Sequence, residues 1–192
     1  MGSASGGLAP DVVAGVRRLG AAIAGAGCTL ITGACPGLPM EAVVGAKGAG
    51  GLVVGISPAL SETEHVQRFH SPVEGFDVLV YTGSGLMGRE VVNIRSSDIV
   101  VIAGGRSGTL GEFAIAYDEG RLLGVLTGTG GVADMIEELV TRMDKETGAR
   151  VLYDDNPESL VSRLIDYYRK EHYRRPSSLH DLAAPQSTQD VG

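Results

Sequence analysis

The chain has 192 residues, of which 43% are hydrophobic, and carries a formal net charge of −7 with a sequence pI near 5.1. We expect residues 1–173 to form a single domain around one core, and the polar residues 174–192 to form a disordered tail. The acidic balance argues against nucleic acid as a partner. The sequence has no long apolar run and no signal peptide, so we expect no membrane partner and a cytoplasmic protein.

Segments of strand and helix character alternate along the chain. Residues 1–7 are rich in Gly and Ser and would form either a disordered start or a βα turn whose preceding strand is absent. Apolar periodicity predicts helices at residues 10–25, 40–49, 87–96, 113–117 and 132–143, and from residue 157 onward. Short apolar runs predict strands at residues 28–32, 52–56, 76–81, 99–103, 122–126 and 150–154. Residues 57–75 show no clear period and are predicted to form a loop.

This alternation predicts a Rossmann-like α/β fold, a doubly wound parallel sheet between two helical layers. Residues 99–103 are apolar without polar alternation, which is typical of an interior strand covered on both faces. In such sheets, ligands bind beyond the carboxyl ends of the strands. Three Gly-rich turns are predicted there, at residues 33–38, 82–88 and 104–109, and they could converge on one pocket.

The turn after residues 99–103 runs directly into a predicted helix, whose N-terminus would present N–H groups to an anion. A tight βα turn needs glycine with or without a ligand, so a structural role remains open. The residues that we expect to bind a phosphate or another ligand group are Gly33, Gly37, Gly85, Gly104, Gly105, Arg106, Ser107, Gly108 and Thr109.

Arg89 and Glu112 are the candidate catalytic residues. Arg89 follows a Gly-rich turn, and its guanidinium could hold a phosphate bidentately, although a solvated helix position is the alternative. Glu112 could hold a ribose hydroxyl or help an oxocarbenium-like sugar to form. The spacing of Thr109 and Glu112 also fits a helix capping box, so both interpretations stay open.

The remaining reactive residue types give no pattern for metal or cofactor chemistry. Cys28 and Cys35 lack metal-type spacing, and Cys35 is either a small packed residue or a thiol of lowered pKa. His65 and His70 lie in the predicted loop and are expected at the surface. A nicotinamide-dependent dehydrogenase is not favoured, because no G-x-G-x-x-G follows a first strand. We expect no metal and no bound cofactor.

Together these residues resemble the LOG family, whose members were often mislabelled as lysine decarboxylases. The family's glycine, threonine and glutamate motif is matched by Gly104-Gly105, Gly108-Thr109 and Glu112. The family also has an arginine on the preceding helix, and Arg89 matches it, nine residues before Asp98. Residues 33–38 and 50–58 match earlier segments, so the resemblance spans residues 10–131.

The chain departs from this family at three places. Arg106 and Ser107 stand where LOG enzymes have one residue, and Glu90 replaces the lysine that follows the arginine. The family's first strand would precede Gly2. The longer turn resembles a sister branch that includes molybdenum cofactor carrier proteins.

The resemblance implies two possible functions for a nucleotide or another phosphorylated small molecule. A phosphoribohydrolase would cleave the N-glycosidic bond of nucleoside 5′-monophosphates, with Arg89 orienting the sugar phosphate or stabilising the leaving base and Glu112 acting on the ribose. A carrier of a phosphorylated cofactor, such as the molybdenum cofactor, would use the same loops without turnover. The family also implies a homodimer, to which helix 87–96 could contribute Val91, Val92 and Ile94.

Overall fold

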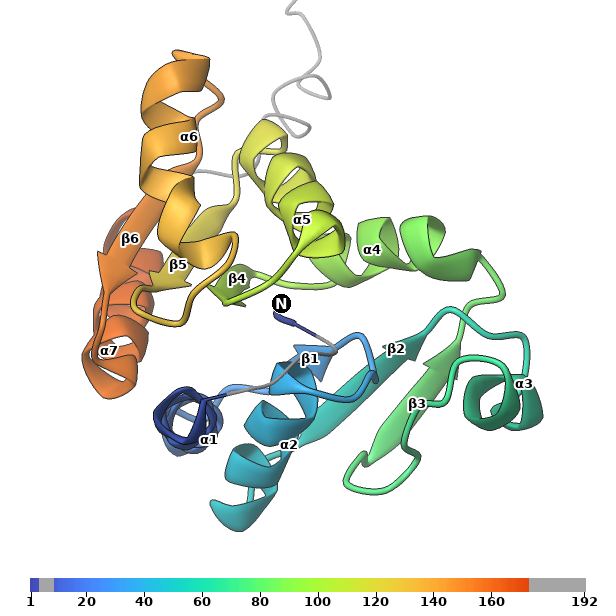
Figure 1. Ribbon diagram of the computed structural model, residues 1–192. Helices are drawn as coiled ribbons and strands as arrows, with labels where there is room; N and C mark the ends of the chain where they lie inside the picture. Colours follow the sequence, from blue (N-terminus) through green and yellow to red (C-terminus); the bar gives the residue numbers. More distant parts are fainter. Residues whose placement is uncertain (4–8, 173–192) are drawn as a thin grey trace, which may run out of the picture.

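The computed structural model describes residues 1–3 and 9–172 (Figure 1). Its strands are β1 (Leu30–Thr32), β2 (Val53–Ser57), β3 (Val78–Tyr81), β4 (Ile99–Ala103), β5 (Leu122–Leu126) and β6 (Arg150–Asp154). Its α-helices are α1 (Pro10–Gly25), α2 (Leu38–Gly48), α3 (Glu62–Gln67), α4 (Gly85–Arg95), α5 (Ser107–Asp118), α6 (Ile136–Met143) and α7 (Pro157–Tyr167). There are also two short helical turns: η1 (Ala133–Met135) precedes α6, and η2 (Tyr168–His172) follows α7.

The strands form two three-stranded parallel sheets, ordered β1-β2-β3 and β4-β5-β6. The N-terminus lies between β1 and β4, where Gly2 makes an isolated parallel bridge to Ala103 (Figure 1). This arrangement confirms the predicted Rossmann-like, doubly wound α/β fold. Residues 4–7 of the predicted start lie outside the described residues, so the two interpretations of the chain start stay predictions.

Helices cover the sheets on both faces. One core packs side chains of α1, α2 and α7 against β1, β4 and β5, with Leu19, Val43 and Leu164 nearly inaccessible to solvent. The second core packs α4, α5 and α6 against the opposite face, around Phe113 and Ile136. All five residues of β5 are buried, as expected for a strand covered on both sides.

Several predicted boundaries shift, and the shift at α5 matters for the site. Strand β1 is shorter than residues 28–32, and α2 begins at Leu38 rather than at residue 40. Helix α5 begins at Ser107, well before the predicted start at residue 113. The extra turn of α5 brings its N-terminus to the end of β4, where a ligand would meet it.

The loop predicted at residues 57–75 is wrong in part, because it contains α3. Ser61 caps this helix by accepting a hydrogen bond from the Glu64 amide at 3.3 Å, and the Glu64 carboxylate accepts one from the Leu60 amide at 2.7 Å. This is close to a capping-box arrangement. The prediction that His65 is exposed is also wrong, since His65 is fully buried and bonded to Ser57 Oγ at 2.8 Å.

The predicted tail at residues 174–192 lies outside the described residues. Within residues 1–3 and 9–172, no helix is long and apolar enough to cross a bilayer.

Candidate functional site

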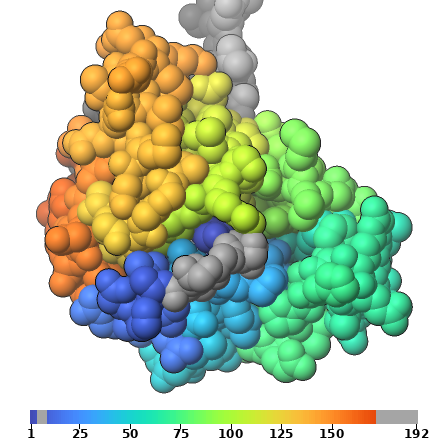
Figure 2. Space-filling view, in the orientation of Figure 1, coloured from blue at the N-terminus to red at the C-terminus, as the bar shows by residue number. Residues whose placement is uncertain are grey.

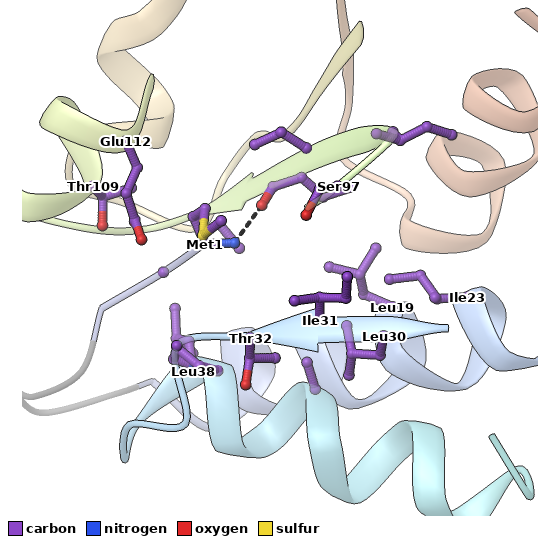
Figure 3. Close-up of a pocket in the computed structure, with 18 of the residues that line it drawn as sticks. Met1, Leu19, Ile23, Leu30, Ile31, Thr32, Leu38, Ser97, Thr109 and Glu112 are labelled. Carbon is purple, nitrogen blue, oxygen red and sulfur yellow. Dashed lines mark hydrogen bonds between the residues drawn. The ribbon is translucent and has the colours of Figure 1, made fainter. Parts of the chain in front are cut away.

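A cavity of about 810 Å³ lies between β1 and β4 and runs along both strands. Figure 2 shows N-terminal atoms recessed between the two halves of the molecule, and Figure 3 shows side chains that line this space. We call the carboxyl ends of the strands the polar end, which is lined by Gly33, Cys35, Arg89, Glu90, Thr109 and Glu112. We call the opposite part the apolar end, which is lined by Leu19, Ile23, Leu30, Ile31, Leu164 and Ile165.

The two glycines after β4 form a turn that the rest of the chain holds in place. Gly104 and Gly105 have φ values of +59° and +103°, which favour glycine. The Gly104 amide donates to Thr129 Oγ1 at 2.8 Å. The carbonyls of Gly104 and Gly105 accept hydrogen bonds from the Ala133 and Val132 amides, both at 3.0 Å. These backbone groups therefore fix the turn.

The first turn of α5 is where an anion could bind. Ser107, Gly108 and Thr109 are its first three residues, and helix geometry leaves their amides without intrahelical acceptors. The residue before them, Arg106, makes no side-chain capping bond. The capping-box alternative for Thr109 and Glu112 is wrong, because Thr109 lies inside the helix rather than at its N-cap.

Arg89 is buried at the wall of the cavity, with 7% of its surface exposed. The alternative that it is a solvated helix residue is therefore wrong. Its Nη1 lies 3.9 Å from Glu112 Oε1, and its Nε has no hydrogen-bond partner among the described residues. The guanidinium lies against Gly33, where an added Cβ would be 1.6 Å from Nη1. A side chain at position 33 would therefore displace the guanidinium from this place.

Glu112 is buried beside Arg89, with 6% of its surface exposed. Burial raises the pKa of this carboxyl above its ordinary value, although the Met1 ammonium and Arg89 both act to lower it. Burial also raises the pKa of the Cys35 thiol, despite the nearby Arg89. The alternative of a Cys35 thiol with a lowered pKa is therefore not supported.

Glu90 adds a second carboxyl to the polar end of the cavity. An added Cβ on Gly108 would lie 3.3 Å from Glu90 Oε1, so this carboxyl packs against the first turn of α5. Burial raises the pKa of Glu90, the Glu112 carboxylate raises it further, and Arg89 opposes both. Sequence reasoning noted Glu90 only as a departure, because adjacent residues of a helix do not ordinarily share a face.

The structure brings most of the predicted site residues to one cavity. Those that line it are Gly33, Arg89, Arg106, Ser107, Gly108, Thr109 and Glu112. Those that do not line it are Gly37, Gly85, Gly104 and Gly105. Gly37 precedes α2, and the Gly85 amide instead donates to the Pro58 carbonyl at 3.2 Å. Cavity-lining residues that the sequence did not indicate include Met1 and Leu86.

The described residues contain no cluster of side chains that could coordinate a metal ion. Within residues 1–3 and 9–172, no group of three or more His, Cys, Asp or Glu side chains is placed to hold a metal ion. The polar end instead combines the Arg89 guanidinium, the carboxyls of Glu90 and Glu112 and the amides of the α5 N-terminus, which is a set suited to binding a polar organic anion.

A sequence model described as the SLOG cluster4 family matches residues 1–161. An uncharacterized protein of Archaeoglobus fulgidus is 36% identical over 104 residues, which cover 54% of this chain and 63% of that protein. The chain thus matches less than two thirds of that relative's length.

Two solved structures have the same fold over most of this chain. The X-ray structure of TM1055 has a TM-score of 0.75 and 26% identity, and the alignment covers 86% of this chain and 95% of that one. The molybdenum cofactor carrier protein of Chlamydomonas reinhardtii has a TM-score of 0.67 and 28% identity, with coverage of 86% and 96%.

Proposed function

The chain belongs to the SLOG cluster4 family, and on that premise we propose that it binds a phosphorylated, nucleotide-like small molecule at the polar end of the cavity. A site of about 810 Å³ falls within the usual size range of small-molecule pockets. The described residues that line the polar end come from β1, α4 and α5 and the turns beside them, so distant parts of the sequence would form one binding site.

The observation that carries this proposal is the environment of Arg89. A buried guanidinium has lost its hydration, and here its Nε lacks a partner among the described residues while its nearest carboxylate contact is 3.9 Å away. An unsatisfied buried donor of this kind is costly. An anionic ligand would supply charge-assisted hydrogen bonds, each contributing roughly 1.5–3 kcal/mol.

The N-terminus of α5 supports the same interpretation from the other wall of the cavity. Ser107, Gly108 and Thr109 line the cavity with the first turn of the helix, where the dipole and the free amides favour negative charge. Glu90 and Glu112 would repel an anion placed directly against them. The phosphate is therefore proposed to lie between Arg89 and the α5 amides, and the carboxyls would face hydroxyl groups of the ligand.

The first form of this function is a carrier that binds its ligand without turnover. The Chlamydomonas relative is a molybdenum cofactor carrier protein by name, and it aligns with most of this chain. The two-residue turn Arg106-Ser107 and the acidic Glu90 resemble this branch more than the LOG enzymes. We propose a phosphorylated cofactor such as the molybdenum cofactor as the cargo in this form.

The second form is hydrolysis of nucleoside 5′-monophosphates, and the position of Glu112 favours it. Its carboxyl lines the same cavity as Arg89 and could stabilise an oxocarbenium-like ribose once ionised. Arg89 would then orient the phosphate or stabilise the leaving base.

Native mass spectrometry of the protein purified from its own cytosol tests the binding proposal. We expect the wild-type protein to retain a phosphorylated small molecule, and Arg89→Ala to lose it. Arg95→Ala is the matched control, because Arg95 lies on the same helix in an exposed ion pair with Glu119. Identical ligand content in wild type and Arg89→Ala would contradict the proposal.

Chromatography of AMP, GMP and CMP incubated with the protein separates the two forms. Hydrolysis requires release of free base, which Glu112→Gln should slow by at least about 100-fold with binding little changed. A carrier releases no base. If Glu112→Gln releases base as fast as wild type, Glu112 is not a catalytic residue.

We also propose that the protein is a homodimer. Leu86, Met87 and Val92 of α4 are 56%, 81% and 37% exposed, so α4 carries exposed apolar side chains that a partner could cover. Ile94 is fully buried in its own core, so it does not contribute to this surface. Light scattering at micromolar concentrations should give about twice the chain mass of 19.8 kDa, and a monomer mass would rule the dimer out.

A further inference from the structure

The carboxyl of Glu90 lies against the first turns of α5 without a partner of its own. An added Cβ on Gly108 would lie 3.3 Å from Glu90 Oε1, and one on Gly111 would lie 3.4 Å from Glu90 Oε2. Gly108 and Gly111 are three positions apart on one face of the helix, so the two glycines let this carboxyl approach the α5 backbone. Among the residues that the structure describes, the Glu90 carboxyl makes no hydrogen bond and no ion pair.

Two independent observations indicate an anion site beside this carboxyl. Arg89 is 7% exposed and lines the cavity, and its Nε has no partner among the described residues. The first amides of α5 lack intrahelical acceptors, since the Leu110 amide is the first that donates to the Arg106 carbonyl, at 2.9 Å. Because Gly108 belongs to this first turn, a phosphate that satisfies both sets of donors would lie next to Glu90.

A bound phosphate would bring three acidic groups together at the polar end. The groups that act on the Glu90 carboxyl are the Glu112 carboxyl of α5 and the Arg89 guanidinium on its own helix. A phosphate monoester would add roughly 1.5 to 2 negative charges at pH 7. The other charged or titratable groups that line the cavity near the two carboxyls are Cys35, Arg106 and the Met1 amino group.

A proton between Glu90 and the phosphate would remove the repulsion at this contact. A phosphate monoester loses its last proton near pH 6, so below neutral pH it can donate an O–H to a carboxylate in a short, strong hydrogen bond. Burial and the Glu112 carboxylate both raise the pKa of Glu90, which also favours holding a proton here. A sulfate ester has no such proton and would meet the carboxylate as a bare anion.

We propose that Glu90 is a specificity-determining residue that accepts a hydrogen bond from a protonated phosphate oxygen, so that the site selects phosphate monoesters and binds them together with one proton. This inference rests on the proposed function, in which the phosphate lies between Arg89 and the α5 amides. A phosphate monoester is mainly a dianion above pH 7. Once the free carboxyl has ionised as well, the shared proton comes from solvent, and affinity falls by about 10-fold for each further pH unit.

Calorimetry of AMP binding in buffers of different ionisation enthalpy counts the protons taken up. At pH 8, wild type should take up about one proton per AMP bound. Glu90→Gln should take up close to none, because the Gln amide donates directly to a dianionic phosphate. Glu138→Gln is the matched control and should behave like wild type, because Glu138 is exposed on α6 in an ion pair with Arg142.

Adenosine 5′-sulfate separates a shared proton from the general effect of removing a negative charge. At pH 6, Glu90→Gln should bind this sulfate ester about 10-fold more tightly than wild type does, since a carboxylate is replaced by a donor. Its affinity for AMP at pH 6 should not rise, because the hydrogen bond from the protonated phosphate to Glu90 is lost. Equal gains for both esters would leave Glu90 with a repulsive role alone and would overturn the inference.

The remaining outcomes distinguish this inference from the binding function on which it rests. Equal proton uptake in wild type and Glu90→Gln would overturn the role of Glu90 while AMP binding itself stands. Uptake that is lost in Glu112→Gln and kept in Glu90→Gln would assign the proton to Glu112 and also overturn it. No AMP binding by wild type at any pH would refute the proposed function and this inference together.

Discussion

The two ends of the cavity are lined by the same pair of strands but differ in what they lack. At the polar end, a buried guanidinium and the first amides of α5 lack an anion. Among the residues that define it, the apolar end has no charged side chain and presents aliphatic side chains of α1, β1 and α7. The comparison indicates that one pair of strands serves two purposes, because their carboxyl ends position charged groups while their bodies contribute to the core.

This separation has a physical reason in the parallel sheet. Turns that follow the strands carry the glycines and helix N-termini, so ligand chemistry collects at one edge. The strand bodies of β1 and β4 carry β-branched and aliphatic side chains that pack under α1 and α7. We therefore expect substitutions at the apolar end to change stability and substitutions at the polar end to change binding.

Leu164→Ala should give the largest effect. Leu164 is 1% exposed and lines the apolar end, so its truncation should lower the free energy of unfolding by about 2–5 kcal/mol. Urea unfolding measures the loss, and Val44→Ala at an exposed position of α2 should change stability by less than about 0.5 kcal/mol. A large loss of nucleotide affinity in folded Leu164→Ala would break the proposed separation.

Gly33→Ala should give an intermediate effect, confined to binding. The new Cβ would occupy the position of Arg89 Nη1, so the guanidinium must move away from its place in the cavity. We expect nucleotide affinity to fall by about 10-fold, equivalent to about 1.4 kcal/mol. Titration calorimetry compares it with Gly15→Ala, where an added Cβ meets nothing within 4 Å and affinity should be unchanged. Equal affinities in the two variants would contradict this role of Gly33.

The smallest effect concerns the pH dependence of stability at Glu112. Burial raises its folded-state pKa, so the folded protein keeps this proton at pH values where the unfolded chain has released it. Stability in the wild type should therefore fall as pH rises from the ordinary carboxyl range through the raised pKa. Glu112→Gln cannot lose a proton, so its stability relative to wild type should increase over that interval. Urea unfolding across the interval checks the sign, and a relative decrease would refute it.

Much of the fold could be predicted from the sequence because its strongest signals are local. The bounds of β4, β5 and β6 agree with the predicted strands, since short apolar runs there end at turn residues. The start of α5 was missed because Ser107 and Gly108 are weak helix formers. The cap at Ser61 and Glu64 was present in the sequence but was overlooked.

The candidate site was predictable only in part, because its decisive contacts join distant segments. The sequence indicated Arg89 and Glu112 individually, but not that Gly33 makes room for the guanidinium. It placed Gly104 and Gly105 in the binding site, whereas Thr129 and Val132 engage their backbone groups. The cavity between β1 and β4 depends on segments that only tertiary structure brings together.

The most direct test of the central claim compares the affinities of AMP and adenosine in wild type, Arg89→Ala and Arg95→Ala. If the polar end binds a phosphate through Arg89, wild type and Arg95→Ala should prefer AMP by roughly 10- to 100-fold, and Arg89→Ala should lose that preference. Equal affinity for AMP and adenosine in wild type, or an undiminished preference in Arg89→Ala, would contradict the proposed site.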